Sequence, residues 1–158
     1  MTAPEIFETL KSLCAAAVLD AKLDVLQPWI SVDPLKMDEV ARALRQDPRL
    51  DFDYAMCMSG MDYNNGTLGA VYHLASMAKK HTIVIKAIVK KEDPRVKSTA
   101  AVWGGAEWHE REAYDMVGIV FEGHPDLRRI LLPDDYPGHP LRKDFQVPEY
   151  YNGMKVPY

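Results

Sequence analysis

The residues that decide the fold read FDYAMCMSGMDYNNGTLGAVYHLASMAKKHTIVIKAIVKK, from Phe52 to Lys91. Three strand-like runs lie within this stretch, at Phe52 to Tyr63, Thr67 to Ser76 and Thr82 to Lys91. The first two are joined by Asn64-Asn65-Gly66, and an Asn-Gly pair supplies the positive φ angles that a tight hairpin turn requires. Both faces of the second run are fairly apolar, so we expect it at the centre of an antiparallel meander.

Helical patterns flank this meander. We expect helices at residues 3 to 16, from Asp33-Pro34 to about Gln46 and from about Gly105 to Val117, and a short strand from Trp29 to Val32. The first helix has apolar residues at helical spacing, and an Asp-Pro pair is a typical N-cap followed by a proline in the first turn. Together these elements predict an α+β fold of two layers, with the helices on one face of a mainly antiparallel sheet.

The composition is that of an ordinary globular protein of one domain, with 158 residues, 47% of them hydrophobic and 27% charged. A net charge of -4 gives no overall positive field for nucleic acid or an anionic membrane surface. The longest apolar stretches are far shorter than the roughly 20 residues of a membrane-spanning helix, and no secretory signal is visible. We therefore expect a cytoplasmic compartment.

The C-terminal segment, residues 124–158, differs from the body at residues 1–123. Six of the eleven prolines fall between Pro125 and Pro157, which excludes a long helix or a central strand there. The segment is nevertheless too apolar and aromatic for a solvated linker, as Phe145, Tyr150 and Tyr151 illustrate. We expect an extended partner-binding tail that wraps another chain; folding back over its own sheet is the alternative.

Few residues are candidates for catalysis or metal binding. Cys14 and Cys57 are predicted to be buried free thiols, and two cysteines cannot ligate an iron–sulfur cluster unaided. His109-Glu110 resembles the start of a zinc-protease H-E-x-x-H helix, but Ala113 stands where the second histidine belongs. A stand-alone metal hydrolase that uses His109 and Glu110 is therefore kept only as an alternative of another class. By itself, the charge run around these residues favours a solvated helix face with i, i+4 ion pairs, Glu107 with Arg111 and Arg111 with Asp115.

Four stretches read in order carry a family resemblance: EREAYDMVGI at 110–119, FEGHPDLRRIL at 121–131, PDDY at 133–136 and GHPLRKDF at 138–145. They resemble the signature of the C subunit, the 30 kDa subunit family, of the bacterial proton-pumping NADH-quinone oxidoreductase, respiratory complex I. Met61-Asp62-Tyr63 also stands in the order found in the family. The resemblance covers roughly residues 25 to 158, and such a length is far more specific than a short motif.

The resemblance implies a non-catalytic structural subunit of the peripheral, hydrophilic arm of that enzyme. Such a subunit scaffolds the iron–sulfur and quinone-reducing subunits for electron transfer from NADH to quinone, which is coupled to proton translocation. Its implied partners are the quinone-reducing large subunit, called D, and the iron–sulfur subunits B and I, with no nucleic acid. Those partners would bind FMN, iron–sulfur clusters and quinone, so no catalytic, cofactor or metal residue is expected in this chain. Membrane association would be peripheral and indirect, at the cytoplasmic face of the bacterial inner membrane.

The resemblance implies that the charged block of the signature supplies structural and partner-interface residues and no catalytic ones. Its residues are Glu110, Arg111, Glu112, Asp115, His124, Asp126, Arg128, Arg129, Arg142, Lys143 and Asp144. The equivalent subunits of membrane-bound hydrogenases and of the photosynthetic NDH-1 complex share the core signature, so assignment of this chain to one of those assemblies remains an alternative. An adaptor protein that associates only transiently is a further alternative.

Overall fold

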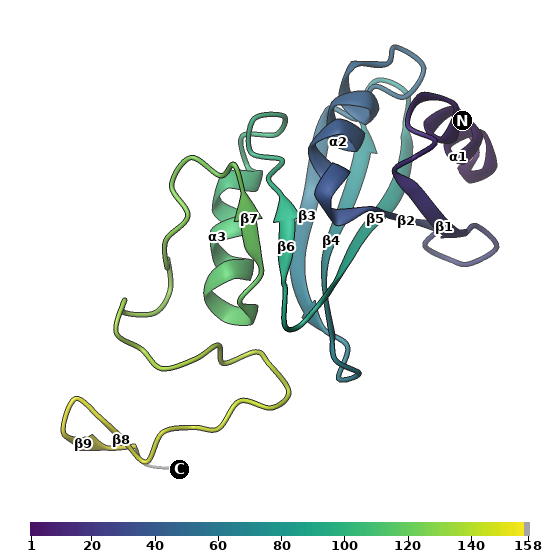
Figure 1. Ribbon diagram of the computed structural model, residues 1–158. Coiled ribbons are helices and arrows are strands. Elements are labelled where there is room, and N and C mark those ends of the chain that lie inside the picture. Colours follow the sequence, from purple (N-terminus) through teal and green to yellow (C-terminus); the bar gives the residue numbers. More distant parts are fainter. Residues whose placement is uncertain (157–158) are drawn as a thin grey trace.

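The computed structural model describes residues 1–156. Figure 1 shows the elements, which follow in this order: α1 (Ala3–Leu13), β1 (Val18–Lys22), β2 (Trp29–Val32), the 3₁₀ turn η1 (Pro34–Lys36), α2 (Met37–Gln46), β3 (Tyr54–Asp62), β4 (Thr67–Ser76), β5 (His81–Lys90), β6 (Arg95–Lys97), α3 (Ala106–Val117), β7 (Val120–Glu122), β8 (Tyr150–Tyr151) and β9 (Met154–Lys155).

The main sheet has five strands in the order β1-β2-β5-β4-β3. Strands β3, β4 and β5 form the predicted antiparallel meander, with β4 between its two neighbours. Strand β2 pairs with β5 in parallel, and β1 pairs antiparallel with β2. The expected mainly antiparallel sheet is therefore confirmed, with one parallel pair that the sequence pattern did not indicate.

The three helices share one core with alternate residues of the sheet. Leu68, Tyr72 and Leu74 of β4 belong to the same buried cluster as Leu10 of α1 and Val117 of α3. Side chains alternate between the faces of a strand, so these β4 residues point to the same side. The predicted two-layer arrangement, with helices on one face of the sheet, is confirmed.

The N-terminal elements differ from the prediction in detail. Helix α1 ends at Leu13 rather than at residue 16, because Cys14 leaves the helical conformation and the chain turns into β1. The N–H of Asp33 donates to the carbonyl of Ala17, which holds this turn against the end of β2. Pairing with β2 thus overrides the helix preference of the alanines at this point.

The two cysteines have different environments. Cys14 is buried, as predicted, but the prediction that Cys57 is buried was wrong, since it is exposed. Cys57 pairs with His73, which lies on the face of β4 away from the helices, and β3 is an outer strand of the sheet. Both thiols are free.

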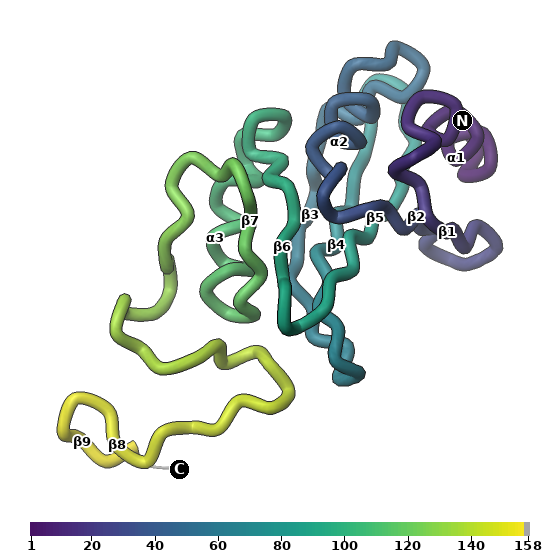
Figure 2. The backbone as a smooth tube through the Cα atoms, viewed as in Figure 1, coloured from purple at the N-terminus to yellow at the C-terminus, as the bar shows by residue number. Residues whose placement is uncertain are grey.

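Beyond β7 the chain runs in irregular conformation past α3 and then away from the sheet. Figures 1 and 2 show this path, with α1 at one end of the molecule and the β8–β9 hairpin at the other. The division into a body at 1–123 and a tail at 124–158 stays a prediction. Within residues 1–156, no helix has the length and apolar character needed to cross a membrane.

Candidate partner-binding surface of helix α3 and the C-terminal segment

Helix α3 lies across β3 and ends at a left-handed glycine. Ala113 and Val117 approach Gly60 of β3 so closely that a Cβ there would lie 3.1 Å from each side chain. Gly118 has φ +79° and donates its N–H to the carbonyls of Ala113 and Tyr114. The absence of a side chain at Gly60 lets the helix sit directly on the strand, and Gly118 ends it as predicted.

The charges of α3 are not a solvated face. Glu110, Arg111 and Asp115 are buried, whereas Glu112 is exposed. Neither i, i+4 ion pair expected from the sequence forms in the described part of the chain; Arg111 donates instead to backbone carbonyls of the C-terminal segment. Burial of a charge is costly without compensation, so each of these groups needs a specific partner.

Glu110 joins α3 to the loop that precedes it. Its Oε1 accepts hydrogen bonds from the N–H and the hydroxyl of Thr99, at 2.7 and 2.8 Å, and its Oε2 is bonded to the hydroxyl of Ser98. Burial raises the pKa of the Glu110 carboxyl, while these hydrogen bonds act in the opposite direction. The side chain is therefore held inside the body and away from the surface.

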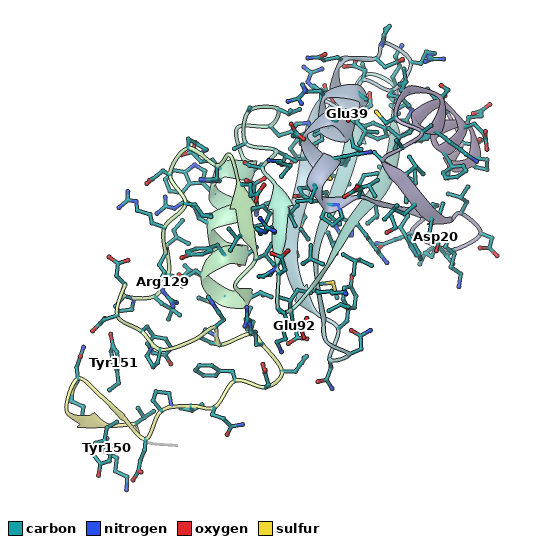
Figure 3. The ribbon with its side chains drawn as sticks, viewed as in Figure 1. Asp20, Glu39, Glu92, Arg129, Tyr150 and Tyr151 are labelled. Carbon is teal, nitrogen blue, oxygen red and sulfur yellow. The ribbon has the colours of Figure 1, made fainter. Side chains whose placement is uncertain are left out.

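Asp115 organises the C-terminal segment where it passes α3. Its Oδ2 accepts the three consecutive N–H groups of residues 130 to 132, at 2.8 to 3.0 Å. Its Oδ1 accepts from Nη1 of Arg129 at 2.8 Å. Burial opposes the charge of Asp115, but the N–H groups outweigh it and lower the pKa of the carboxyl. Figure 3 shows Arg129 on the part of the segment beside α3.

Two arginines shape the backbone of the same stretch. Arg111 donates from Nε to the carbonyl of Arg128 at 3.3 Å and from Nη2 to that of Arg129 at 3.1 Å. Arg129 in turn donates from Nη2 to the carbonyls of Tyr136 and Gly138, both at 3.0 Å. The irregular path of the segment is thus fixed by charged donors in place of a regular ladder.

The C-terminal end of α3 holds the next part of the segment. Nδ1 of His139 donates to the carbonyl of Asp115 at 2.9 Å, and Nε of Arg142 donates to that of Val117 at 2.6 Å. Both donors satisfy carbonyls in the last turn of the helix, and the charge of the Arg142 guanidinium also complements the helix dipole. Burial lowers the pKa of His139.

Asp62, at the end of β3, fixes the segment further along. Its Oδ2 accepts the N–H of Lys143 at 2.9 Å and lies 3.2 Å from Nζ of Lys91. Lys91 also contacts Asp144 at 2.8 Å. The backbone N–H groups of Lys143 and Asn64 lower the pKa of Asp62 to about 2. The first part of the C-terminal segment, up to Asp144, is therefore tied to the body at both ends.

The remaining members of the predicted charged block lie nearer the surface. Nε of Arg128 is 2.9 Å from Asp126, in a pair whose side chains are both about half exposed or more. Nε2 of His124 donates to the carbonyl of Glu107 at 2.9 Å. Within the predicted charged block, the exposed residues are Glu112, Asp126, Arg128, Lys143 and Asp144.

All eleven predicted interface residues thus gather around α3 and the segment beside it, but many of their contacts are internal. Glu110, Arg111, Asp115, Arg129 and Arg142 use their charged groups to hold this chain together. A direct role of the block at a partner interface stays a prediction. Asp62 and Lys91 are anchors that the sequence patterns did not indicate, because Asp62 and Lys143 are 81 residues apart and no local pattern joins them.

The segment also carries large apolar side chains at its surface. Leu131, Leu141, Val147, Tyr150 and Met154 are each more than half exposed. The ring of Tyr136 contacts Phe145 and Tyr151, at centroid distances of 6.4 and 5.3 Å. Figure 3 shows Tyr150 and Tyr151 on opposite sides of the β8–β9 hairpin. Apolar surface of this kind is typical of protein interfaces.

The arrangement around His109 and Glu110 does not make a metal site. Both oxygens of Glu110 bond to Ser98 and Thr99, while His109 lines a cavity between α3 and β3. Among residues 1–156, no three His, Cys, Asp or Glu side chains gather where they could hold a metal ion. The metal-hydrolase alternative therefore lacks a ligand set in the described part of the chain.

The comparisons with known proteins agree with the signature around α3. A family model described as "Respiratory-chain NADH dehydrogenase, 30 Kd subunit" matches residues 30–151. The chain belongs to this family. The match includes β2 to β7 and most of the C-terminal segment, so the anchors described above lie within it.

Among members of this 30 kDa family, the C subunit of the NADH-quinone oxidoreductase of Chloroherpeton thalassium is 50% identical in an alignment of 154 residues that covers 96% of this chain and 64% of that relative. The corresponding C subunit of Chlorobium phaeobacteroides is 47% identical over 134 residues, covering 83% of this chain and 81% of the relative. The chain thus spans slightly under two thirds of the length of the first of these relatives.

Two solved structures extend the family likeness to the fold. A trypsin-resistant fragment of Nqo5 superposes with a TM-score of 0.62 at 27% identity, covering 80% of this chain and all of the fragment. A chain of the membrane-bound sulfane sulfur reductase, an archaeal respiratory membrane complex, superposes with a TM-score of 0.70 at 22% identity, covering 90% of this chain and 85% of that one. The second likeness concerns the fold alone.

Proposed function

We propose that this chain is a structural subunit of the peripheral arm of a bacterial NADH-quinone oxidoreductase and has no catalytic centre of its own. In this role it positions the iron–sulfur and quinone-reducing subunits through which electrons pass from NADH to quinone, a reaction coupled to proton translocation. Membership of the 30 kDa family supports the assignment to the assembly.

One observation carries the scaffold role. The part of the C-terminal segment up to Asp144 is tied to the body by buried charges, yet it leaves the large apolar side chains of Leu131 and Leu141 exposed. A rigid backbone with uncovered apolar side chains pays little ordering entropy on binding, so it suits a permanent interface. The segment is accordingly the part of the chain that we assign to a neighbouring subunit.

The partners in this proposal are the quinone-reducing large subunit, called D, and the iron–sulfur subunits B and I. FMN, the iron–sulfur clusters and quinone belong to partner subunits, and the chain itself holds no cofactor. The complex holds the chain at the cytoplasmic face of the inner membrane, and contact with the bilayer is indirect.

Gentle solubilisation of membranes from cells that express the tagged chain tests the proposal. We expect one copy of the chain to co-purify with flavin- and iron–sulfur-bearing subunits. A complex with hydrogenase subunits and no flavin subunit would assign the chain to that type of assembly instead. Substoichiometric recovery would favour a transient adaptor, and recovery of the chain alone with stoichiometric metal would favour the hydrolase.

A further inference from the structure

Strand β3 has one free edge. The N–H of Tyr63 donates to the carbonyl of Thr67, so these two residues form a hydrogen-bonded pair at the hairpin end. Hydrogen-bonded and non-hydrogen-bonded pairs alternate along an antiparallel ladder. The backbone N–H and C=O groups of Met58, Gly60 and Asp62 therefore point away from β4 and out of the sheet.

These outward groups are left unpaired within the chain. Among residues 1–156, the N–H groups of Met58 and Gly60 have no acceptor outside the β3–β4 ladder. The ladder is regular from Cys57 to Asp62, and β3 contains no Lys, Arg or Pro. Edge strands that must not pair with another chain are normally short, irregular or charged.

The two edges of the sheet differ in length and in regularity, because β3 has nine residues and its only register shift lies near its start, between Ala55 and Cys57. Strand β1 is five residues long, carries Asp20 and Lys22, and has a register shift between Val18 and Asp20. The contrast between the two edges marks β3 as the one built to accept a further strand.

A groove runs beside the free edge. The cavity between α3 and β3 has a volume of about 210 Å³ and is lined by residues of both elements. Helix α3 contributes His109, Glu112 and Met116, at spacings i, i+3 and i+7 along one side of the helix, and Leu141 adds an exposed apolar side chain. A strand placed along β3 would thus meet backbone partners on one side and a side-chain pocket next to them.

We propose that the edge of β3 binds an extended segment of a partner subunit, which adds a sixth strand to the sheet. Its alternate apolar side chains enter the groove between α3 and β3, and a Lys or Arg side chain faces Glu112. This inference rests on the function proposed above, because it needs an assembly that supplies the strand.

A second copy of this chain fits the edge less well. In a symmetric pair each β3 would lie along the β3 of the other copy, so any cation that faces Glu112 would have to come from that strand. The sequence of β3, YAMCMSGMD, offers none. Charge complementarity therefore favours a different chain as the occupant.

Residue-resolved hydrogen exchange tests the inference, with the isolated full chain compared with the purified assembly. We expect the amides of Met58 and Gly60 to exchange at least about tenfold more slowly in the assembly. The amide of Ser59, which bonds to β4 in both states, serves as the internal control and should change by less than about twofold.

A charge-reversal variant tests the side-chain part of the recognition. Glu112→Lys should return the exchange of Met58 and Gly60 in the assembly towards the rate of the isolated chain. Glu8→Lys, at an exposed site on α1, is the matched control and should leave both amides protected. Cross-linking from the exposed thiol of Cys57 should join β3 to one extended, basic peptide of a partner subunit.

The outcomes separate this inference from the function proposed above. If the chain is recovered in the assembly while Met58 and Gly60 exchange as in isolation, the inference is wrong and the proposed function stands. If protection appears in the isolated chain together with a dimer mass, the edge belongs to a second copy and the inference is wrong. If the chain does not enter the assembly at all, both proposals fail.

Discussion

The carboxylate of Asp115 lies 2.8 Å from Nη1 of Arg129, 14 residues further along the chain, and also accepts three backbone N–H groups next to that arginine. The carboxylate is fully buried and the arginine side chain is 14% exposed. One helical side chain thus determines the path of a segment that has no ladder of its own. Several residues of the charged block thus stabilise the conformation of this chain itself, independently of any contact with a partner.

Replacement of Asp115 by asparagine should release this stretch. The amide keeps the shape of the carboxylate but loses its charge, so Arg129 is left buried without a counter-ion. We expect Asp115→Asn to lower the free energy of unfolding by about 3 kcal/mol. Urea denaturation measures the loss, and hydrogen exchange at residues 130–132 should show the same bonds opening.

Asp126→Asn is the matched control for this change. Its partner Arg128 is exposed and solvent screens the pair, so the same substitution should cost much less than Asp115→Asn. Equal losses for the two variants would contradict the organising role of the buried carboxylate.

Protonation of the Asp62 carboxylate in acid should release the C-terminal segment near Lys143. Its pKa in the folded chain is about 2, below the ordinary 3.8, so its stabilising contribution is complete above pH 3.8 and is lost as the pH falls from about 4 to about 2. The NMR signal of the Lys143 amide should shift over this window. In Asp62→Asn the Lys143 amide signal should have the chemical shift of the released segment at every pH. The turn at Asn64 can persist in this variant, because the remaining side-chain oxygen of residue 62 still accepts its N–H.

Two glycines next to α3 should respond oppositely to alanine. A Cβ at Gly118 would lie 2.5 Å from His139 and Arg142 and would require φ +79°, so Gly118→Ala should cost about 2 kcal/mol and loosen both side chains. A Cβ at Gly104 meets nothing within 4 Å, so Gly104→Ala should be neutral or stabilising by up to about 1 kcal/mol. Thermal unfolding of both variants measures the difference.

Local patterns predicted the parts of the fold that depend on local chemistry. The Asn-Gly turn, the Asp33 N-cap and the glycine at the end of α3 were all placed correctly, because each needs one residue type at one position. Strand β1 was missed, since its pairing with β2 depends on tertiary contact and not on its own periodicity.

The chemistry around α3 was only half predictable. The family resemblance pointed to the charged residues of this region, but a spacing of i, i+4 suggested an ion pair of Arg111 with Asp115 where the structure pairs Asp115 with Arg129. A sequence pattern of charged and apolar residues along a helix cannot reveal that a distant, irregular segment of the chain covers the charged side of that helix. The same applies to the Asp62 anchor, whose partners lie 29 and 81 residues away.

Glu110 should make the chain less stable as the pH rises from acid towards neutrality. Burial raises its pKa above the ordinary 4.5, so between that value and the folded pKa the unfolded chain loses its proton first, and the free energy of unfolding falls. In Glu110→Gln the amide oxygen can accept from Thr99 and the amide nitrogen can donate to Ser98, so the hydrogen bonds remain without a titrating group. The variant should therefore gain stability relative to the wild type as the pH rises above the ordinary pKa of 4.5. Glu112→Gln, at an exposed site on the same helix, should follow the wild type, and parallel curves for wild type and Glu110→Gln in urea titrations would refute the role of burial at this carboxyl.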